Sequence, residues 1–228
     1  MPGYEKVNGK VVKADLSRGP VLARRGAMLF YTGQVSFRPA GGGMPGGMSG
    51  GMPGMGGLGA IAGMAGRALA GEHVAMMAAE GMGEVHYGFR GSNVTVIELQ
   101  GELLQVEADR LLCHDANLQS SVVVLGSGGV RQAVRGAVSG QGLATTQISG
   151  MGSVAVLSHG GTFALPVTGG QTIGVDPQSY VAAQGNLTVD VAASLGWRDA
   201  VGKGSGEAIQ LKVTGQGTVY VQASERKL

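Results

Sequence analysis

The sequence predicts an all-β protein built from repeated units. Glycine supplies 44 of its 228 residues, about one in five, whereas about 7% is usual in globular domains. A block that reads G-x-G, then a small or acidic residue, then Val occurs three times, beginning at Gly81, Gly150 and Gly215. Runs rich in Val, Leu and Thr lie close to each block, and long stretches of helical period are few. These observations favour short strands joined by glycine-rich turns.

Each glycine block is expected to form the turn of a hairpin. The apolar runs before the blocks are 74–79, 143–148 and 208–213, and alternating runs such as Val154–Val156 and Val219–Val221 follow. Glycine adopts positive φ without steric penalty and is therefore common in such turns. The pattern predicts strand, turn and strand, made three times.

A second block supports the same register. Residues 106–118 align with 175–187 at an offset of 69, and 24–35 is a looser first copy. The predicted units are 1–97, 98–164 and 165–228, and short helical insertions are expected at 60–70, 130–138 and 195–201.

Composition excludes several classes of function. The net charge is only +2 and charged residues make up 14%, which argues against a nucleic-acid partner. Cys113 is the single cysteine, so an intramolecular disulfide framework and a Cys-rich zinc site are excluded. The N-terminus has no secretory or transit pattern, and we expect a cytoplasmic protein. Residues 39–66 carry no charge, but the many glycines there argue against a membrane-spanning helix.

A loop at 41–59 is unusually rich in glycine and methionine. Eleven of its nineteen residues are glycine. Thioethers suit Cu(I), but the loop has no His or Cys, and an adaptable apolar contact surface is the favoured interpretation. The predicted residues for self-association or partner contact are Met44, Met48, Met52, Met55, Leu58 and Ile61.

Basic residues recur in the three predicted insertions. On one face of the molecule they could contact an anionic membrane surface, although solvated charges at the rim are the simpler alternative. The residues concerned are Arg67, Arg131, Arg135, Arg198 and Lys203, with Trp197 beside them.

No motif for catalysis is present. Cys113, His114 and Asp115 are the nearest approach to a catalytic cluster, but adjacent strand residues point to opposite faces. The four histidines lack metal-ligand spacing, and neither a P-loop nor a G-x-S-x-G motif occurs. We therefore expect no enzymatic activity, no metal and no cofactor.

Several segments together resemble a known family. They are Arg25–Met28, Gly66–Glu72, Gly81–Val85, Ile97–Leu99 and Thr214–Gln222. In order and spacing they are similar to the family of altered inheritance of mitochondria twenty-four, the mitochondrial biogenesis proteins, as a bacterial member. The resemblance implies three similar β-sandwich units around a pseudo-threefold axis, with a fold like that of the tryptophan-RNA-binding attenuation protein. It implies no established enzymatic activity, and its fungal mitochondrial member is associated with the inner membrane and with the complex that organises cristae.

The sequence thus predicts a non-catalytic structural or scaffold protein. We expect a cytoplasmic homo-oligomer, peripheral to the membrane, which contacts a membrane surface or a protein partner through the glycine- and methionine-rich loop. The alternative is a module that binds a small ligand between repeats or subunits.

Overall fold

A computed structural model describes residues 3–40, 74–125, 143–193 and 209–225. Within these ranges the chain forms fifteen strands in two antiparallel sheets, with two short 3-10 helices, η1 (Leu16–Arg18) and η2 (Ala108–Arg110). The predicted all-β class is therefore confirmed. The helical insertions expected at 60–70, 130–138 and 195–201 lie outside the described residues.

The first sheet contains eight strands. Their order is β1 (Tyr4–Asn8), β2 (Val11–Asp15), β5 (Met76–Tyr87), β3 (Val21–Arg24), β8 (Leu111–Asp115), β11 (Met151–Ser158) and β6 (Asn93–Gln100), while β4 (Met28–Pro39) pairs with β5.

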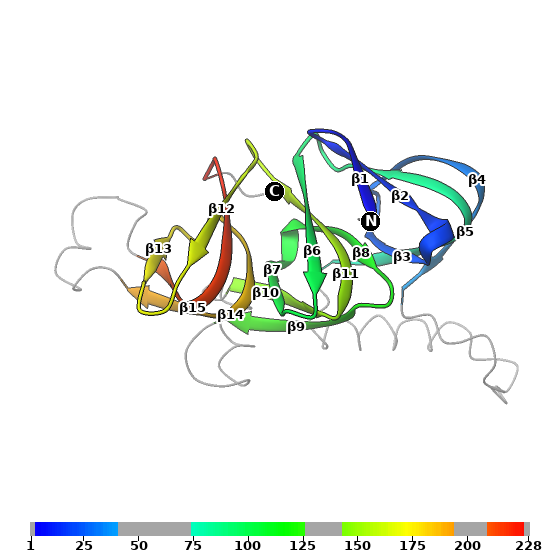
Figure 1. Cartoon of the computed structure of the whole chain (residues 1–228). Helices are drawn as coiled ribbons and strands as arrows, with labels where there is room; N and C mark the ends of the chain where they lie inside the picture. The colour runs from blue at the N-terminus through cyan, green and yellow to red at the C-terminus, as the bar shows by residue number, and fades with distance from the viewer. Residues whose placement is uncertain (1–2, 41–73, 126–142, 194–208, 226–228) are drawn as a thin grey trace, which may run out of the picture.

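The second sheet contains seven strands. Their order is β12 (Thr162–Val167), β15 (Ile209–Gln222), β14 (Tyr180–Ala193), β7 (Leu104–Glu107), β10 (Leu143–Ser149) and β9 (Gln119–Leu125), while β13 (Ile173–Val175) pairs with β15. In Figure 1, β4 and β5 lie at one end of the molecule and β13 lies at the other. The strands β4 and β13 therefore do not pair with each other, and the described residues do not show the pseudo-threefold arrangement that the resemblance implied.

The glycine blocks do not form hairpin turns, so the prediction of three hairpins is wrong. Gly81 and Gly83 lie inside β5, which runs unbroken from Met76 to Tyr87. The third block lies in the same way inside β15, and Gly150 is a single residue between β10 and β11. The strand β5 pairs with β3 through residues 76–79 and with β2 through residues 84–87, while β4 follows it along its length. Figure 1 shows β4 and β5 as a curved pair.

Glycine is required in β5 because two backbones approach closely there. Gly81 has a φ of 128°, and a Cβ atom on it would overlap the carbonyl oxygen of Gln34 in β4. Gly83 lies directly opposite Gly33. A glycine within a strand commonly marks such a bend or close approach. The glycines therefore keep the strand continuous where the sequence pattern predicted a turn.

Three clusters of buried apolar side chains fill the interior. The first lies around Val85 and Leu112, the second around Leu104 and Val154, and the third around Val219. All five side chains are nearly or fully inaccessible to solvent, so each cluster excludes water and stabilises the sheets through apolar burial.

A buried arginine lies in the short segment of chain that joins the two sheets. Arg110 lies in η2, between β7 of the second sheet and β8 of the first, and is 2% exposed. Its guanidinium donates to the side-chain oxygen of Gln222 and to the carbonyl of Gln178, and its Nε lies 3.5 Å from Glu107 Oε2. Charged groups are tolerated in an interior when they are paired and hydrogen bonded in this way.

We predict that Gly81→Ala destabilises the fold more than Gly101→Ala. Both glycines have positive φ, 128° and 111°, so both substitutions carry the backbone strain of about 1–3 kcal/mol. Only Gly81 also faces a backbone oxygen, whereas a Cβ on Gly101 meets no atom within 4 Å. Urea unfolding of the two variants measures the difference, and equal losses of stability would contradict a close crossing of β4 and β5.

Candidate functional site

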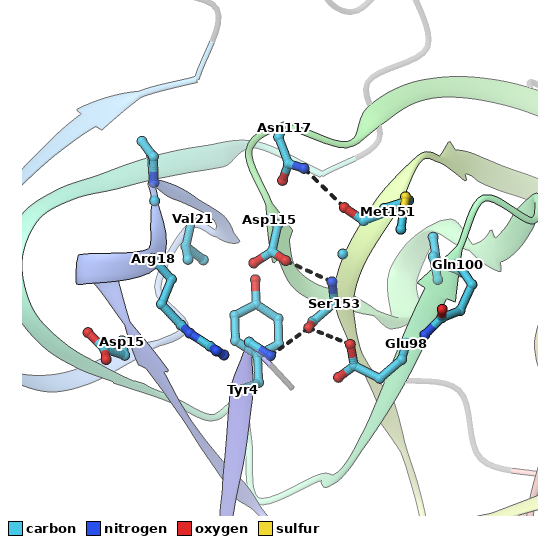
Figure 2. Close-up of a pocket in the computed structure, with 15 residues that line it drawn as sticks. Tyr4, Asp15, Arg18, Val21, Glu98, Gln100, Asp115, Asn117, Met151 and Ser153 are labelled. Carbon is cyan, nitrogen blue, oxygen red and sulfur yellow. Dashed lines mark hydrogen bonds between the residues drawn. The ribbon is translucent and has the colours of Figure 1, made fainter. Parts of the chain in front are cut away.

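A polar cleft of about 380 Å³ lies where the N-terminal strand β1 approaches β8, β11 and β6, the strands at the other end of the first sheet. Residues of β1 and η1 form one wall, and residues of β6, β8 and β11 form the other (Figure 2). The polar side chains that define it are Arg18, Glu98, Asp115 and Ser153.

Ser153 joins three segments of the chain at the floor of this cleft. Its backbone N–H donates to Asp115 Oδ2 at 2.7 Å, and its hydroxyl donates to Glu98 Oε2 at 2.8 Å. The same hydroxyl oxygen accepts from the backbone N–H of Gly3 at 3.0 Å. Gly152 makes room for this arrangement, because a Cβ there would lie 2.7 Å from Asp115 Oδ2.

Glu98 and Asp115 form an acidic wall of the cleft, and the basic side chain of Arg18 lies opposite on a short, capped turn. Asp15 Oδ1 accepts from the backbone N–H of Ser17 at 2.9 Å. Hydrogen bonding to the side chain and to the backbone N–H of Ser17 lowers the pKa of the Asp15 carboxyl. Arg18 ends the same turn, and Figure 2 shows its side chain pointing toward the centre of the cleft. The second carboxylate oxygen of Glu98 is buried and accepts no hydrogen bond within the described part of the chain. The cleft therefore offers negative and positive groups to a small polar molecule.

Buried titratable groups lie in β8. The Cys113 thiol is inaccessible to solvent, and burial raises its pKa well above the ordinary value. His114 is 1% exposed, and burial lowers its pKa, while its Nδ1 lies 2.8 Å from the Asp115 carbonyl oxygen. Neither a reactive thiolate nor an imidazolium is favoured in this environment.

The residues predicted from sequence to contact partners cannot be placed. All twelve lie outside the described residues: Met44, Met48, Met52, Met55, Leu58, Ile61, Arg67, Arg131, Arg135, Trp197, Arg198 and Lys203. In the described ranges, no group of three or more His, Cys, Asp or Glu side chains could hold a metal ion. No helix in those ranges is long and apolar enough to cross a membrane.

Sequence reasoning did not identify the cleft. Glu98 and Asp115 come from two strands that both pair with β11, so their proximity depends on strand pairing and not on spacing along the chain. The one local signal is Gly152 before Ser153, and in the sequence this glycine is equally typical of a turn.

We predict that the free energy of unfolding falls as the pH is lowered from 7.5 to 5.5. The pKa of His114 is lower in the folded chain than its ordinary value of about 6.5, so the unfolded state binds more protons below that pH. The stability lost on acidification should be smaller in His114→Gln. Urea unfolding at both pH values measures this, and the same pH dependence in both proteins would contradict the prediction.

Comparison with known proteins places the chain in a family. The profile of the mitochondrial biogenesis family AIM24 matches residues 4–224. Protein SPYM3_0169 of Streptococcus pyogenes, solved by X-ray crystallography, superposes with a TM-score of 0.71 at 19% identity, over 97% of this chain and 92% of that one. At that identity the likeness concerns the fold, and a search of curated proteins finds no match. The profile covers nearly every residue, and the chain belongs to the mitochondrial biogenesis AIM24 family.

Proposed function

We propose that this chain is a non-catalytic structural protein that self-associates and serves as a scaffold peripheral to a membrane. Membership of the AIM24 family suggests a role related to mitochondrial biogenesis proteins. In this proposal the protein is cytoplasmic, three similar units lie in a row along the chain, and residues 41–59 contact the membrane surface or a protein there.

A run of exposed apolar side chains at the start of β4 is the observation that supports self-association. Met28, Leu29, Phe30 and Tyr31 are 41%, 51%, 52% and 47% exposed. Apolar side chains in a contiguous exposed run, on a strand at a sheet edge, are a common feature of association surfaces.

The aromatic residues of this run are held in place. The Phe30 ring stacks on His86 with the ring centres 4.1 Å apart, and Tyr31 contacts Phe37 edge to face at 5.5 Å. A surface already ordered by such contacts loses less conformational entropy when a partner covers it.

Position along the chain connects this surface with the glycine- and methionine-rich loop. The strand β4 ends at Pro39, and the loop follows at residue 41. Methionine side chains adapt to imprecise apolar surfaces, and Arg67 and the other basic residues of the predicted insertions would favour anionic lipid.

We predict that the intact protein has a mass in solution well above the 22.9 kDa of one chain and floats with anionic vesicles. Deletion of residues 41–59 should abolish flotation, because the loop supplies the membrane contact, and should leave self-association through β4 in place. Light scattering and vesicle flotation measure both properties, with zwitterionic vesicles as the control. A single-chain mass, together with flotation that the deletion does not change, would contradict the proposal.

The cleft supports a second candidate, a module that binds a small ligand. Arg18 faces Glu98 and Asp115 across it, so a molecule with both an acidic and an amino group would find a partner on each wall.

We predict for this candidate that free amino acids raise the melting temperature of the protein and that Arg18→Ala removes the rise, because a bound ligand stabilises only the folded state. Ser158→Ala is the matched control, since Ser158 is buried outside the cleft and its hydroxyl has no hydrogen-bond partner within the described residues. No rise with any amino acid would eliminate this candidate.

A further inference from the structure

Two junctions between distant strands have the same construction. The strand β3 pairs with β8 in the first sheet, and β7 pairs with β14 in the second. Each junction consists of three antiparallel residue pairs. The pairs are Val21 with Asp115, Leu22 with His114 and Ala23 with Cys113 at the first junction, and Leu104 with Gln184, Gln105 with Ala183 and Val106 with Ala182 at the second.

The residues beside these pairs also correspond. Leu112 in β8 and Val181 in β14 are each the extra residue of a β-bulge, and each directly precedes the paired residues. At the far end of the pairs, Ala116 N–H donates to the Pro20 carbonyl at 3.0 Å, and Gly185 N–H donates to the Leu103 carbonyl at 2.8 Å. The register at both junctions is thus fixed by the same local features.

The strand β4 has the same bulge and the same glycine as β14, but no described strand pairs with it at the corresponding place. Leu29 is the extra residue of its β-bulge, and Gly33 lies opposite Gly83 as Gly185 lies opposite Gly217 in β14. Among the described strands β4 pairs only with β5, so the opposite edge of its residues 30–32 has no described strand beside it.

The strand β13 is the counterpart of β3 and β7. It pairs with β15 on one side, as β3 pairs with β5 and β7 with β10, and its other edge has no described strand beside it. Figure 1 places β13 and β4 at opposite ends of the molecule, so they cannot pair within one chain.

Burial differs at the corresponding positions. Leu112 and Val181, the extra residues at the two formed junctions, are fully buried, whereas Leu29 in β4 is 51% exposed. His114 and Ala183 are buried in the middle of their junctions, whereas Tyr31 at the corresponding position is 47% exposed. The extra residue of the bulge is thus apolar in all three strands, buried at the two formed junctions and exposed in β4. This difference indicates that a further strand covers β4.

We propose that β13 of one copy of this chain pairs with β4 of the next copy, in the register of the two internal junctions. Ile173 then lies opposite Thr32, Gly174 opposite Tyr31 and Val175 opposite Phe30, and Gly33 N–H donates to the Thr172 carbonyl. Gly174 suits this arrangement, because it leaves room beside the bulky Tyr31 side chain. The proposal rests on the proposed self-association and names the surface and the partner.

The test uses two variants of the full chain, Tyr31→Lys and Gly174→Lys. Each places a charge in one of the two edges, which prevents strand addition. Both sites tolerate the change in the isolated fold, since Tyr31 is half-exposed and a Cβ on Gly174 has only Gln210 Oε1 nearby, at 3.7 Å. Phe163→Lys, at an exposed aromatic residue on β12, is the matched control, and circular dichroism verifies that all three variants fold.

We expect the wild type and Phe163→Lys to show the same multiple of the single-chain mass by light scattering, and each of the two edge variants to show the mass of one chain. An equimolar mixture of Tyr31→Lys with Gly174→Lys should give a dimer, because one unchanged β13 edge and one unchanged β4 edge remain.

Three results would overturn the proposal. Edge variants that keep the wild-type mass, or a mixture that stays at the mass of one chain, would exclude this pairing while leaving self-association intact. A wild type with the mass of one chain would overturn both this pairing and the proposed function.

Discussion

The fold depends on places where the backbones of two paired strands approach so closely that only glycine fits. At Gly33, Gly81 and Gly83 the strands β4 and β5 pass too near each other for a Cβ atom, and the pair β14 and β15 does the same at Gly185 and Gly217. Because β5 continues through its crossing, its two halves reach β3 and β2. The two halves of β15 reach β13 and β12 in the same way. Glycines in this chain thus allow paired strands to curve, in addition to forming ordinary turns.

The polar interior depends on a few buried side chains that are hydrogen bonded to several segments of the chain at once. Arg110 lies between the sheets with Glu107, Gln178 and Gln222 around it, and removal of any partner would leave a buried charge underpaired. Ser153 has the same role within the first sheet, where it joins β6, β8 and the N-terminal segment. The contacts of Ser153 hold together the strands that carry Glu98 and Asp115, and so fix the acidic side of the cleft.

The sequence was sufficient to predict the all-β class, because apolar alternation and glycine spacing report directly on strands. It was misleading at Gly81 and Gly215, since glycine with positive φ serves a tight turn and a bend in a continuous strand equally well, and neighbouring residues do not distinguish them. The cleft was not predicted because Arg18, Glu98 and Ser153 approach one another only once the strands have paired. The predicted partner residues rest on the composition of the loop and on the recurrence of basic residues in the three insertions. The exposed run in β4 gives no such signal, because Phe30 and Tyr31 are equally typical of a buried strand.

The strands β4 and β13 each pair with one described strand and leave one edge that no described strand covers, and these two edges differ chemically. The edge of β4 has large aromatic and aliphatic side chains, while that of β13 is three residues long with a glycine at its centre. A twofold-symmetric dimer brings identical surfaces together, so contact between unlike edges is heterologous. An assembly made by such contacts has direction, with a β4 edge at one terminus and a β13 edge at the other. Whether it closes into a ring or grows into a filament depends on the rotation from one copy to the next, and therefore on the curvature that the glycines give to each strand pair.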